Sequence, residues 1–295
     1  MVLDAIKLIR CLWSRDFTED KVWRFIFEEV KKKAEAVEAG EPAPIIGSKR
    51  GDGILGSNEE YPIWSVRNLD YTISLLTWHI ATEVCFQIQQ DEDYGPTSPE
   101  NMDCKERSKL ISDYMFFLLK ESAAITMSNF DRQSLIETVS RGLRTLPMDS
   151  ISSLDGKKIS KAIFLRERAT DWLKLPVSRE SVTAFTFGRI LAFQLKELGF
   201  PWKIMSQVWV EIMCHVAIRC RPNVYAQQSG KGGQLLTLVW LLMNSLGLGR
   251  LVETRELDIG DGNESTILND IGHGHEPTNP NELLDLLLGA WDAEF

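Results

Sequence analysis

Apolar residues recur at intervals of three and four along most of the chain, which places them on one face of a helix. In the segment 63–90, this face carries Ile73, Leu76, Ile80, Val84 and Ile88. Similar patterns predict further helices at 1–38 in two pieces, 105–126, 131–145, 157–174, 179–198, 202–221 and 234–247. No segment alternates apolar and polar residues in the manner of a half-buried strand. The sequence therefore predicts an all-α, bundle-like fold of about nine helices.

The segments around the predicted core differ from it in composition. Two helices are expected at 1–38, and the stretch 39–62, rich in glycine and proline, is expected to be a linker or loop. The helical core is predicted at 63–250, and residues 1–250 together are expected to form a single domain. The last segment, 251–295, is rich in acidic residues and glycine and is expected to be a mobile acidic tail that ends in a short helix.

The charge of the chain is concentrated in separate segments. The chain has 295 residues, of which 44% are hydrophobic and 25% charged, and a formal net charge of -9. This composition is typical of a globular protein. The segment 251–295 holds eleven acidic residues and one basic residue, a balance of -10, whereas 151–250 holds six acidic and fourteen basic residues, a balance of +8. The acidic tail and the basic region are therefore expected to attract each other.

The sequence predicts a soluble protein of a reducing compartment. No run approaches the roughly 18 to 20 consecutive apolar residues of a membrane-spanning helix. The five cysteines are not closely paired and no secretory signal precedes them, which favours the cytoplasm. The amphipathic, basic start of the chain would suit a mitochondrial presequence, but Asp4, Asp16, Glu19 and Asp20 argue against one. Import into an organelle remains the alternative.

Motifs of unusual composition occur in order along residues 60–250. Trp78–Thr82 reads WHIAT, Ser112–Met115 reads SDYM, Trp202–Ala217 reads WKIMSQVWVEIMCHVA, and Gly232–Met243 reads GGQLLTLVWLLM. These motifs resemble a plant family known by the labels DUF4220 and DUF594. Members typically carry several membrane-spanning helices ahead of these domains, and no biochemical activity is established for the family. The resemblance implies a shortened, soluble member.

The chain departs from the family pattern at two positions that could carry proton transfer. Where relatives read His-Ala and, further on, Gly-Gly-Glu, this chain has Tyr225-Ala226 and Gly233-Gln234. Tyrosine and glutamine do not transfer protons near pH 7. We therefore expect a protein that is not an enzyme.

His79 and Glu83 lie four residues apart, on one face of the predicted helix 63–90. A carboxylate in that position could orient an imidazole for acid–base chemistry or for a metal. Because the neighbouring positions are apolar, the favoured interpretation is a buried, hydrogen-bonded pair. Cys214, His215 and Cys220 form only one unmatched cluster, so neither a metal site nor a cofactor is expected.

A glycine-rich loop precedes the predicted helix 234–247. It consists of Ser229, Gly230, Lys231, Gly232 and Gly233. Its backbone N–H groups and the Lys231 ammonium could hold an anion. The spacing is not that of a phosphate-binding P-loop, and a simple turn at the start of a helix is the alternative. The basic residues of 157–168 alternate with apolar ones as on a solvated helix face, so no nucleic-acid partner is expected.

The end of the acidic tail carries a short apolar pattern formed by Leu283, Leu284, Leu286, Leu287 and Trp291. An acidic segment with such a pattern is suited to the groove of another helical protein. It could equally dock on the basic region of its own chain. The sequence thus predicts a non-enzymatic protein that binds a partner protein and restrains, relocates or neutralises it. The alternative is a small-molecule or anion-binding protein, even a weak enzyme, built on 229–233 and on His79 and Glu83.

Overall fold

The computed structural model describes residues 19–40, 49–91, 98–121, 184–219 and 234–248. Within these ranges the chain forms eight helices and no strand, which confirms the predicted all-α fold. The helices are α2 (Glu19–Glu38), α4 (Asp52–Leu55), α5 (Trp64–Arg67), α6 (Tyr71–Asp91), α7 (Pro99–Glu121), α12 (Ala184–Glu197), α13 (Trp202–Arg219) and α15 (Gln234–Ser245). The helices predicted at 131–145 and 157–174, the first piece of 1–38 and the acidic tail lie outside the described residues.

Two helix starts differ from the predicted ones because polar caps decide them. The predicted helix 63–90 is divided into α5 and α6, and the Asp70 carboxylate accepts the N–H of Thr72 (2.9 Å) at the start of α6. Helix α7 begins at Pro99 rather than near 105, with the Ser98 hydroxyl accepting the N–H of Asn101 (3.3 Å). Proline suits the first helical position, because a backbone N–H there would have no acceptor within the helix. The first turn of α7 is polar, so apolar spacing does not detect it.

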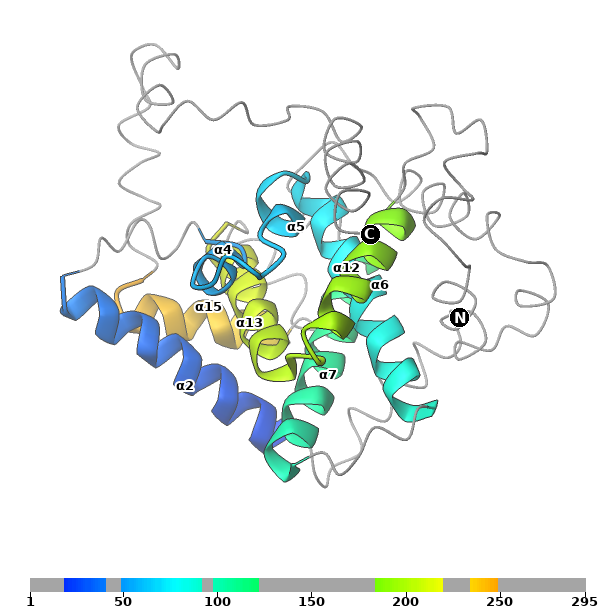
Figure 1. Ribbon diagram of the computed structural model, residues 1–295. Coiled ribbons are helices and arrows are strands. Elements are labelled where there is room, and N and C mark those ends of the chain that lie inside the picture. Colours follow the sequence, from blue (N-terminus) through cyan, green and yellow to red (C-terminus); the bar gives the residue numbers. More distant parts are fainter. Residues whose placement is uncertain (1–18, 41–48, 92–97, 122–183, 220–233, 249–295) are drawn as a thin grey trace, which may run out of the picture.

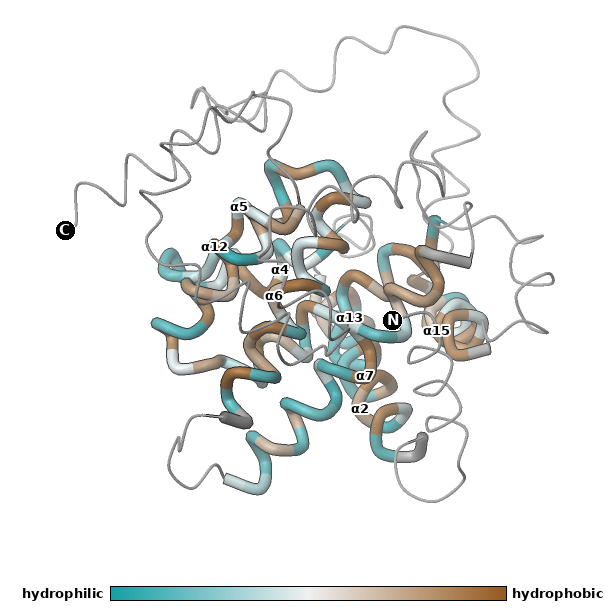
Figure 2. Tube along the Cα trace, turned by 90° about the vertical axis from the view of Figure 1, so that its right-hand side faces the viewer, coloured by the Kyte–Doolittle hydropathy of each residue, from teal (hydrophilic) through white to brown (hydrophobic). Residues whose placement is uncertain are grey.

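Helix α13 lies at the centre of the described part of the molecule (Figure 1). Of its 18 residues 14 are buried. It packs against α2, α4, α7 and α15, while α6 packs against α5, α7 and α12. Figure 2 shows apolar residues along α13 and α15 and a mixture of apolar and hydrophilic residues along α2. A helix that is apolar on all sides belongs in the interior, and α13 occupies that position.

Four tryptophans donate their indole N–H to a side chain of a different helix. Trp64 donates to Gln194 (2.9 Å), Trp78 to Ser65 (3.0 Å), Trp202 to Gln89 (2.7 Å) and Trp209 to Thr82 (3.0 Å). The rings of Trp78 and Trp209 also meet edge to face, with centroids 6.5 Å apart. Buried tryptophan requires such an acceptor. Three of these tryptophans belong to the motifs quoted above, whose tryptophan positions are thereby explained by packing.

Gly188 of α12 lies tightly against α6. A Cβ atom at this position would lie 2.7 Å from Cβ and Cγ2 of Ile80 and 3.2 Å from the carbonyl oxygen of Thr77. Contacts below 3 Å force the neighbouring atoms to move, because a packed interior has no spare volume. Glycine therefore sets the distance between these two helices.

Replacement of Gly188 by alanine should destabilise the fold by about 1–3 kcal/mol, because overpacking forces α6 and α12 apart. This loss opposes the intrinsic preference of alanine for a helix, which is about 1 kcal/mol. Urea unfolding followed by circular dichroism measures the change. The Ile80→Ala substitution removes Cγ2, so the cost of Gly188→Ala should be smaller in that background. Strictly additive costs would contradict the steric explanation.

Candidate functional site

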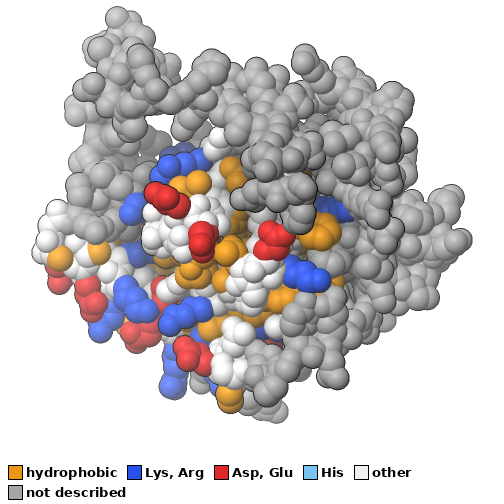
Figure 3. All heavy atoms as spheres, viewed as in Figure 1, with side chains coloured by type: hydrophobic (Ala, Val, Ile, Leu, Met, Phe, Trp, Pro, Cys, Tyr) orange, Lys and Arg blue, Asp and Glu red, His pale blue; other side chains and the backbone are white. Residues whose placement is uncertain are grey.

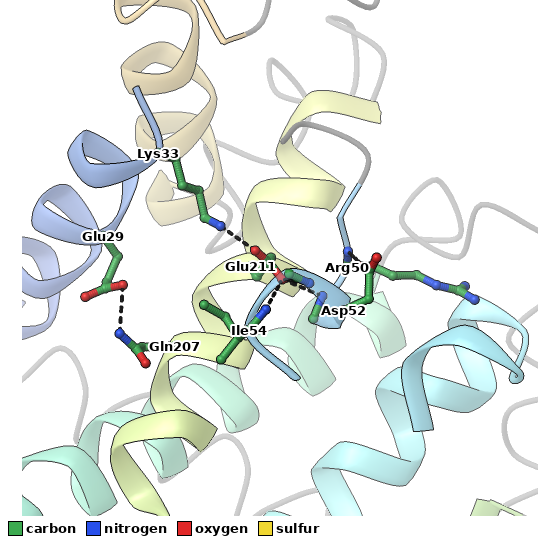
Figure 4. Close-up of polar contacts among 9 residues, drawn as sticks. Glu29, Lys33, Arg50, Asp52, Ile54, Gln207 and Glu211 are labelled. Carbon is green, nitrogen blue, oxygen red and sulfur yellow. Dashed lines mark hydrogen bonds and ion pairs between the residues drawn. The ribbon is translucent and has the colours of Figure 1, made fainter. Parts of the chain in front are cut away.

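A buried carboxylate occupies the middle of α13 (Figure 4). The Glu211 side chain is 2% exposed and lies between α2 and α4. Its Oε1 accepts a hydrogen bond from the Lys33 ammonium of α2. Its Oε2 accepts the backbone N–H groups of Gly51 (3.1 Å), Gly53 (2.9 Å) and Ile54 (3.3 Å). A buried charge is tolerated only when paired and hydrogen-bonded in this way.

Two glycines allow the segment before α4 to approach this carboxylate. Gly51 has φ +120, which L side chains rarely adopt. A Cβ atom at Gly53 would lie 2.7 Å from Oε1 of Glu211. The segment is held from the other side by Arg50, whose guanidinium donates to the carbonyl oxygens of Arg67 (3.1 Å) and Leu69 (2.9 Å). Part of the predicted loop 39–62 therefore forms a short helix and a cradle of backbone amides.

The Glu211 cluster connects three elements of the fold. Both oxygens of the carboxylate are occupied, one by Lys33 and the other by the α4 segment. A second link between α2 and α13 lies beside it, where Gln207 donates to Glu29 (3.2 Å). The arrangement fixes α2 and α4 on α13 and leaves no oxygen facing solvent. Sequence reasoning did not single out Glu211, although a carboxylate in an otherwise apolar helix is a signal for a buried, paired charge.

His79 and Glu83 each bond to α7 rather than to each other in the described structure. The Nδ1 atom of His79 lies 2.9 Å from the Ser112 hydroxyl, and its ring stacks on Phe116 with centroids 4.2 Å apart. Glu83 pairs with the Lys109 ammonium at 2.8 Å. Two of the sequence motifs, WHIAT and SDYM, thus meet across the α6–α7 interface.

One ammonium group faces two carboxylates at this interface, because Lys109 pairs with Asp113 (2.5 Å) as well as with Glu83. Burial raises the pKa of Asp113 to about 6, despite the neighbouring Lys109. At Glu83 the Lys109 ammonium and the Gln87 amide outweigh burial and lower the pKa of the carboxyl. Burial, followed by the nearby Lys109, lowers the pKa of His79 to about 4. The imidazole is therefore neutral near pH 7.

This cluster is arranged for packing rather than for catalysis. A serine–histidine pair can act as nucleophile and base, but the Ser112 residue is 1% exposed and its hydroxyl lies within the helix interface. Asp113 and Glu83 are both occupied by Lys109. The sequence-based interpretation of a buried pair in which His79 and Glu83 bond to each other differs from these contacts, because both residues are half-buried and each has its partner on α7.

The cysteines of the described residues are buried and separate. Burial raises the pKa of the Cys214 thiol to about 12, and it raises that of Cys85 as well. Cys85 donates to the carbonyl oxygen of Ala192 (3.7 Å), and the ring of His215 stacks on Tyr71. Within the described ranges no three His, Cys, Asp or Glu residues gather in a metal-binding arrangement. Cys220 lies outside these ranges.

Several predicted sites lie outside the described residues. These are the glycine loop Ser229, Gly230, Lys231, Gly232 and Gly233 and the tail residues Leu283, Leu284, Leu286, Leu287 and Trp291. Ten of the fourteen basic residues of 151–250 also lie outside. The docking of the tail on this basic region therefore stays a prediction.

Helix α15 presents an apolar surface to solvent. Leu236, Val239 and Met243 are buried, whereas Leu238 and Leu241 on another side of the helix are 45% and 50% exposed. The fifteen residues 234–248 include no charged residue and no histidine. The start of the helix is held by Tyr114 of α7, whose hydroxyl accepts the N–H of Leu236 (2.9 Å). We call the side formed by Leu238 and Leu241 the α15 face.

The fold and these clusters define an all-α protein with a buried, internally paired carboxylate at its centre. A model of the family described as "Protein of unknown function, DUF594" matches residues 196–248, a segment that includes α13 and α15. The match supports the DUF594 part of the resemblance noted in the sequence. No curated protein and no solved structure matches the chain significantly. In the described part of the chain, no helix is both long enough and apolar enough to span a membrane.

Replacement of Glu211 by leucine should destabilise the protein by about 3–5 kcal/mol, because it leaves the Lys33 ammonium and three amides without their acceptor. Guanidinium unfolding measures this loss. The matched control is Glu35→Leu, which breaks the exposed pair of Glu35 with Lys31 (3.6 Å) and should cost less than about 1 kcal/mol. In a Lys33→Leu background the cost of Glu211→Leu should fall, since no buried ammonium is left unpaired. Equal costs at 211 and 35 would show that the cluster contributes nothing.

The low pKa of His79 predicts a pH-dependent stability. The folded protein keeps this imidazole neutral down to about pH 4, whereas the unfolded chain binds a proton below about pH 6.5. Lowering the pH through this window therefore favours unfolding. Relative to a His79→Gln variant, the wild-type free energy of unfolding should fall between about pH 6.5 and pH 4 and stay level above this range.

Asp113 provides a control, because its contribution to the free energy of unfolding should change with pH in the opposite direction. Its pKa is raised to about 6 in the folded protein, so the folded state binds a proton before the unfolded chain does. Relative to Asp113→Asn, the wild type should gain stability as the pH falls from about 6 to about 4. Urea unfolding of the three proteins across this pH range separates the contributions. Parallel curves for all three would contradict both assignments.

Proposed function

We propose that this protein is not an enzyme and acts by binding a partner protein through the α15 face. The observation that supports the proposal is the uncharged helix α15, with Leu238 and Leu241 about half exposed. Exposed apolar residues that form one contiguous patch mark interaction sites, and Leu238 and Leu241 are neighbours on the helix surface. The partner expected from this chemistry is a helix with an apolar stripe.

The neighbouring helix α2 carries a further exposed apolar side chain, Phe27. In the described part of the molecule, the large apolar side chains that are exposed are Phe27, Met102, Leu238 and Leu241. Three of these four lie on α2 and α15, which pack against each other. The rest of the solvent side of α2 is charged, and Figure 3 shows acidic and basic side chains along it. An apolar centre beside charged groups is the usual composition of a protein–protein interface.

The wider proposal keeps the features that the resemblance implies. We propose a soluble plant protein related to DUF4220 as well as DUF594, acting in the cytoplasm. Binding would restrain, relocate or neutralise the partner, as a regulator or an antidote does.

Anion or small-molecule binding receives less support from the described residues. His79 and Glu83 are engaged with Ser112 and Lys109 of α7, and the loop 229–233 lies outside the described ranges. Partner binding is the function that the geometry favours.

Substitution of both Leu238 and Leu241 by lysine should abolish recovery of the partner in affinity purification from native tissue. Both side chains are about half exposed, so the fold should lose no more than about 1 kcal/mol. Met102→Lys is the matched control, because Met102 is similarly exposed (46%) but lies on α7. Mass spectrometry should find proteins that are recovered with the wild type and with Met102→Lys, and lost with the double variant. Identical recovery with all three proteins would refute the proposal.

A further inference from the structure

We infer that the segment 281–291 of the same chain covers the α15 face when no partner is bound. The inference rests on the proposed function, since it concerns the same face. It adds a competition in which the partner displaces the chain's own C-terminal segment.

The α15 face leaves apolar area without a partner in the described structure. Leu238 and Leu241 lie three positions apart and therefore on one side of the helix. Leu235 and Leu242, next to them, are half-buried and pack against the core. The face is thus continuous with the core and ends in solvent, where a half-exposed leucine forgoes about half of the roughly 1.5–3 kcal/mol that full burial provides.

The size of the face favours a segment of the same chain over a second copy. Helix α15 has 12 residues, which corresponds to a length of about 18 Å. A stable complex between separate molecules buries about 800 Å² on each partner, more than two half-exposed leucines provide. A tethered segment binds at an effective concentration in the millimolar range, so a small apolar contact is sufficient. A partner protein would compete by adding contacts outside this face.

The position of the segment in the chain makes the contact attainable. The last described residue, Leu248, is buried at the end of α15. The 32 residues of 249–280 separate it from the apolar segment. A flexible chain of this length has an average end-to-end distance of about 30 Å, which exceeds the length of α15. The linker can therefore reach the face while the effective concentration of the tethered segment stays high.

The pattern of 281–291 matches an uncharged face. Leu284, Leu287, Leu288 and Trp291 follow the spacing i, i+3, i+4 and i+7, which predicts one apolar stripe. The acidic residues Glu282 and Asp285 fall outside this stripe. Because α15 carries no charged residue, the stripe can lie on it while no carboxylate of α15 repels these acids.

A photo-cross-linker in the full-length chain tests the contact directly. With p-benzoylphenylalanine in place of Leu241, mass spectrometry should find an intramolecular cross-link to residues 281–291. The same group in place of Met102, on α7, should give no link to these residues. Cross-links from position 241 to any other segment, to a second copy of the chain, or to nothing would each overturn the inference.

A variant of the C-terminal segment separates this inference from the proposed function. The change Leu284→Asp with Leu287→Asp should reduce the cross-link from position 241 about tenfold or more, since two apolar contacts are lost. The same change, without the cross-linker, should increase recovery of the partner, because its competitor is removed. If the cross-link is absent but Leu238→Lys with Leu241→Lys still abolishes partner recovery, the proposed function stands and the inference is wrong. If the cross-link forms but partner recovery is unaffected by those lysines, the proposed function is wrong and the inference stands.

Discussion

The pairing of the Glu211 carboxylate is the interaction on which the arrangement of the other helices depends. One oxygen is bound to Lys33 of α2, and the other to three amides of the α4 segment. A carboxylate in the interior without these donors would cost several kcal/mol, so α2 and α4 have one favourable position on α13. Apolar packing alone does not select that position, because it depends on buried area and not on direction.

The same principle applies to the rest of the core, where polar groups select one packing arrangement among apolar helices. Helix α13 is apolar on nearly every side, so apolar packing alone does not fix its rotation about its own axis. The bonds of Trp202 to Gln89 and of Trp209 to Thr82 connect one orientation of α13 to α6. Ser112 and Lys109 of α7 do the same for His79 and Glu83 of α6. The motifs that carry the family resemblance are therefore, where they are described, largely the residues that fix helix against helix.

The sequence was sufficient to predict the helices but not the contacts between them. Helices α6, α12, α13 and α15 are confirmed by the structure. They could be predicted because apolar spacing is a property of neighbouring residues in the sequence. The partner of Glu211 lies 178 positions away at Lys33, and no spacing rule connects such positions. The glycines at 51 and 53 indicated a loop, although their role is to admit a carboxylate that only the folded chain places there. His79 and Glu83 were predicted to be a buried pair, whereas both are half-buried, and their partners on α7 depend on the α6–α7 crossing and were not predictable.

The contacts that position α2 and α15 leave the α15 face open. Glu211 and Glu29 hold α2 on one side of α13, and Tyr114 of α7 holds the first turn of α15. Helix α15 is therefore positioned by neighbours that contact its inner side and its start. The exposed positions of α15 whose burial the structure describes are Leu238, Leu241 and Ser245. Charged residues on that outer side would have improved solubility at no cost to the core. Their absence, next to a helix α2 whose solvent side is charged, separates the α15 face from an ordinary exposed helix and is the physical basis of the proposal that this face binds a partner.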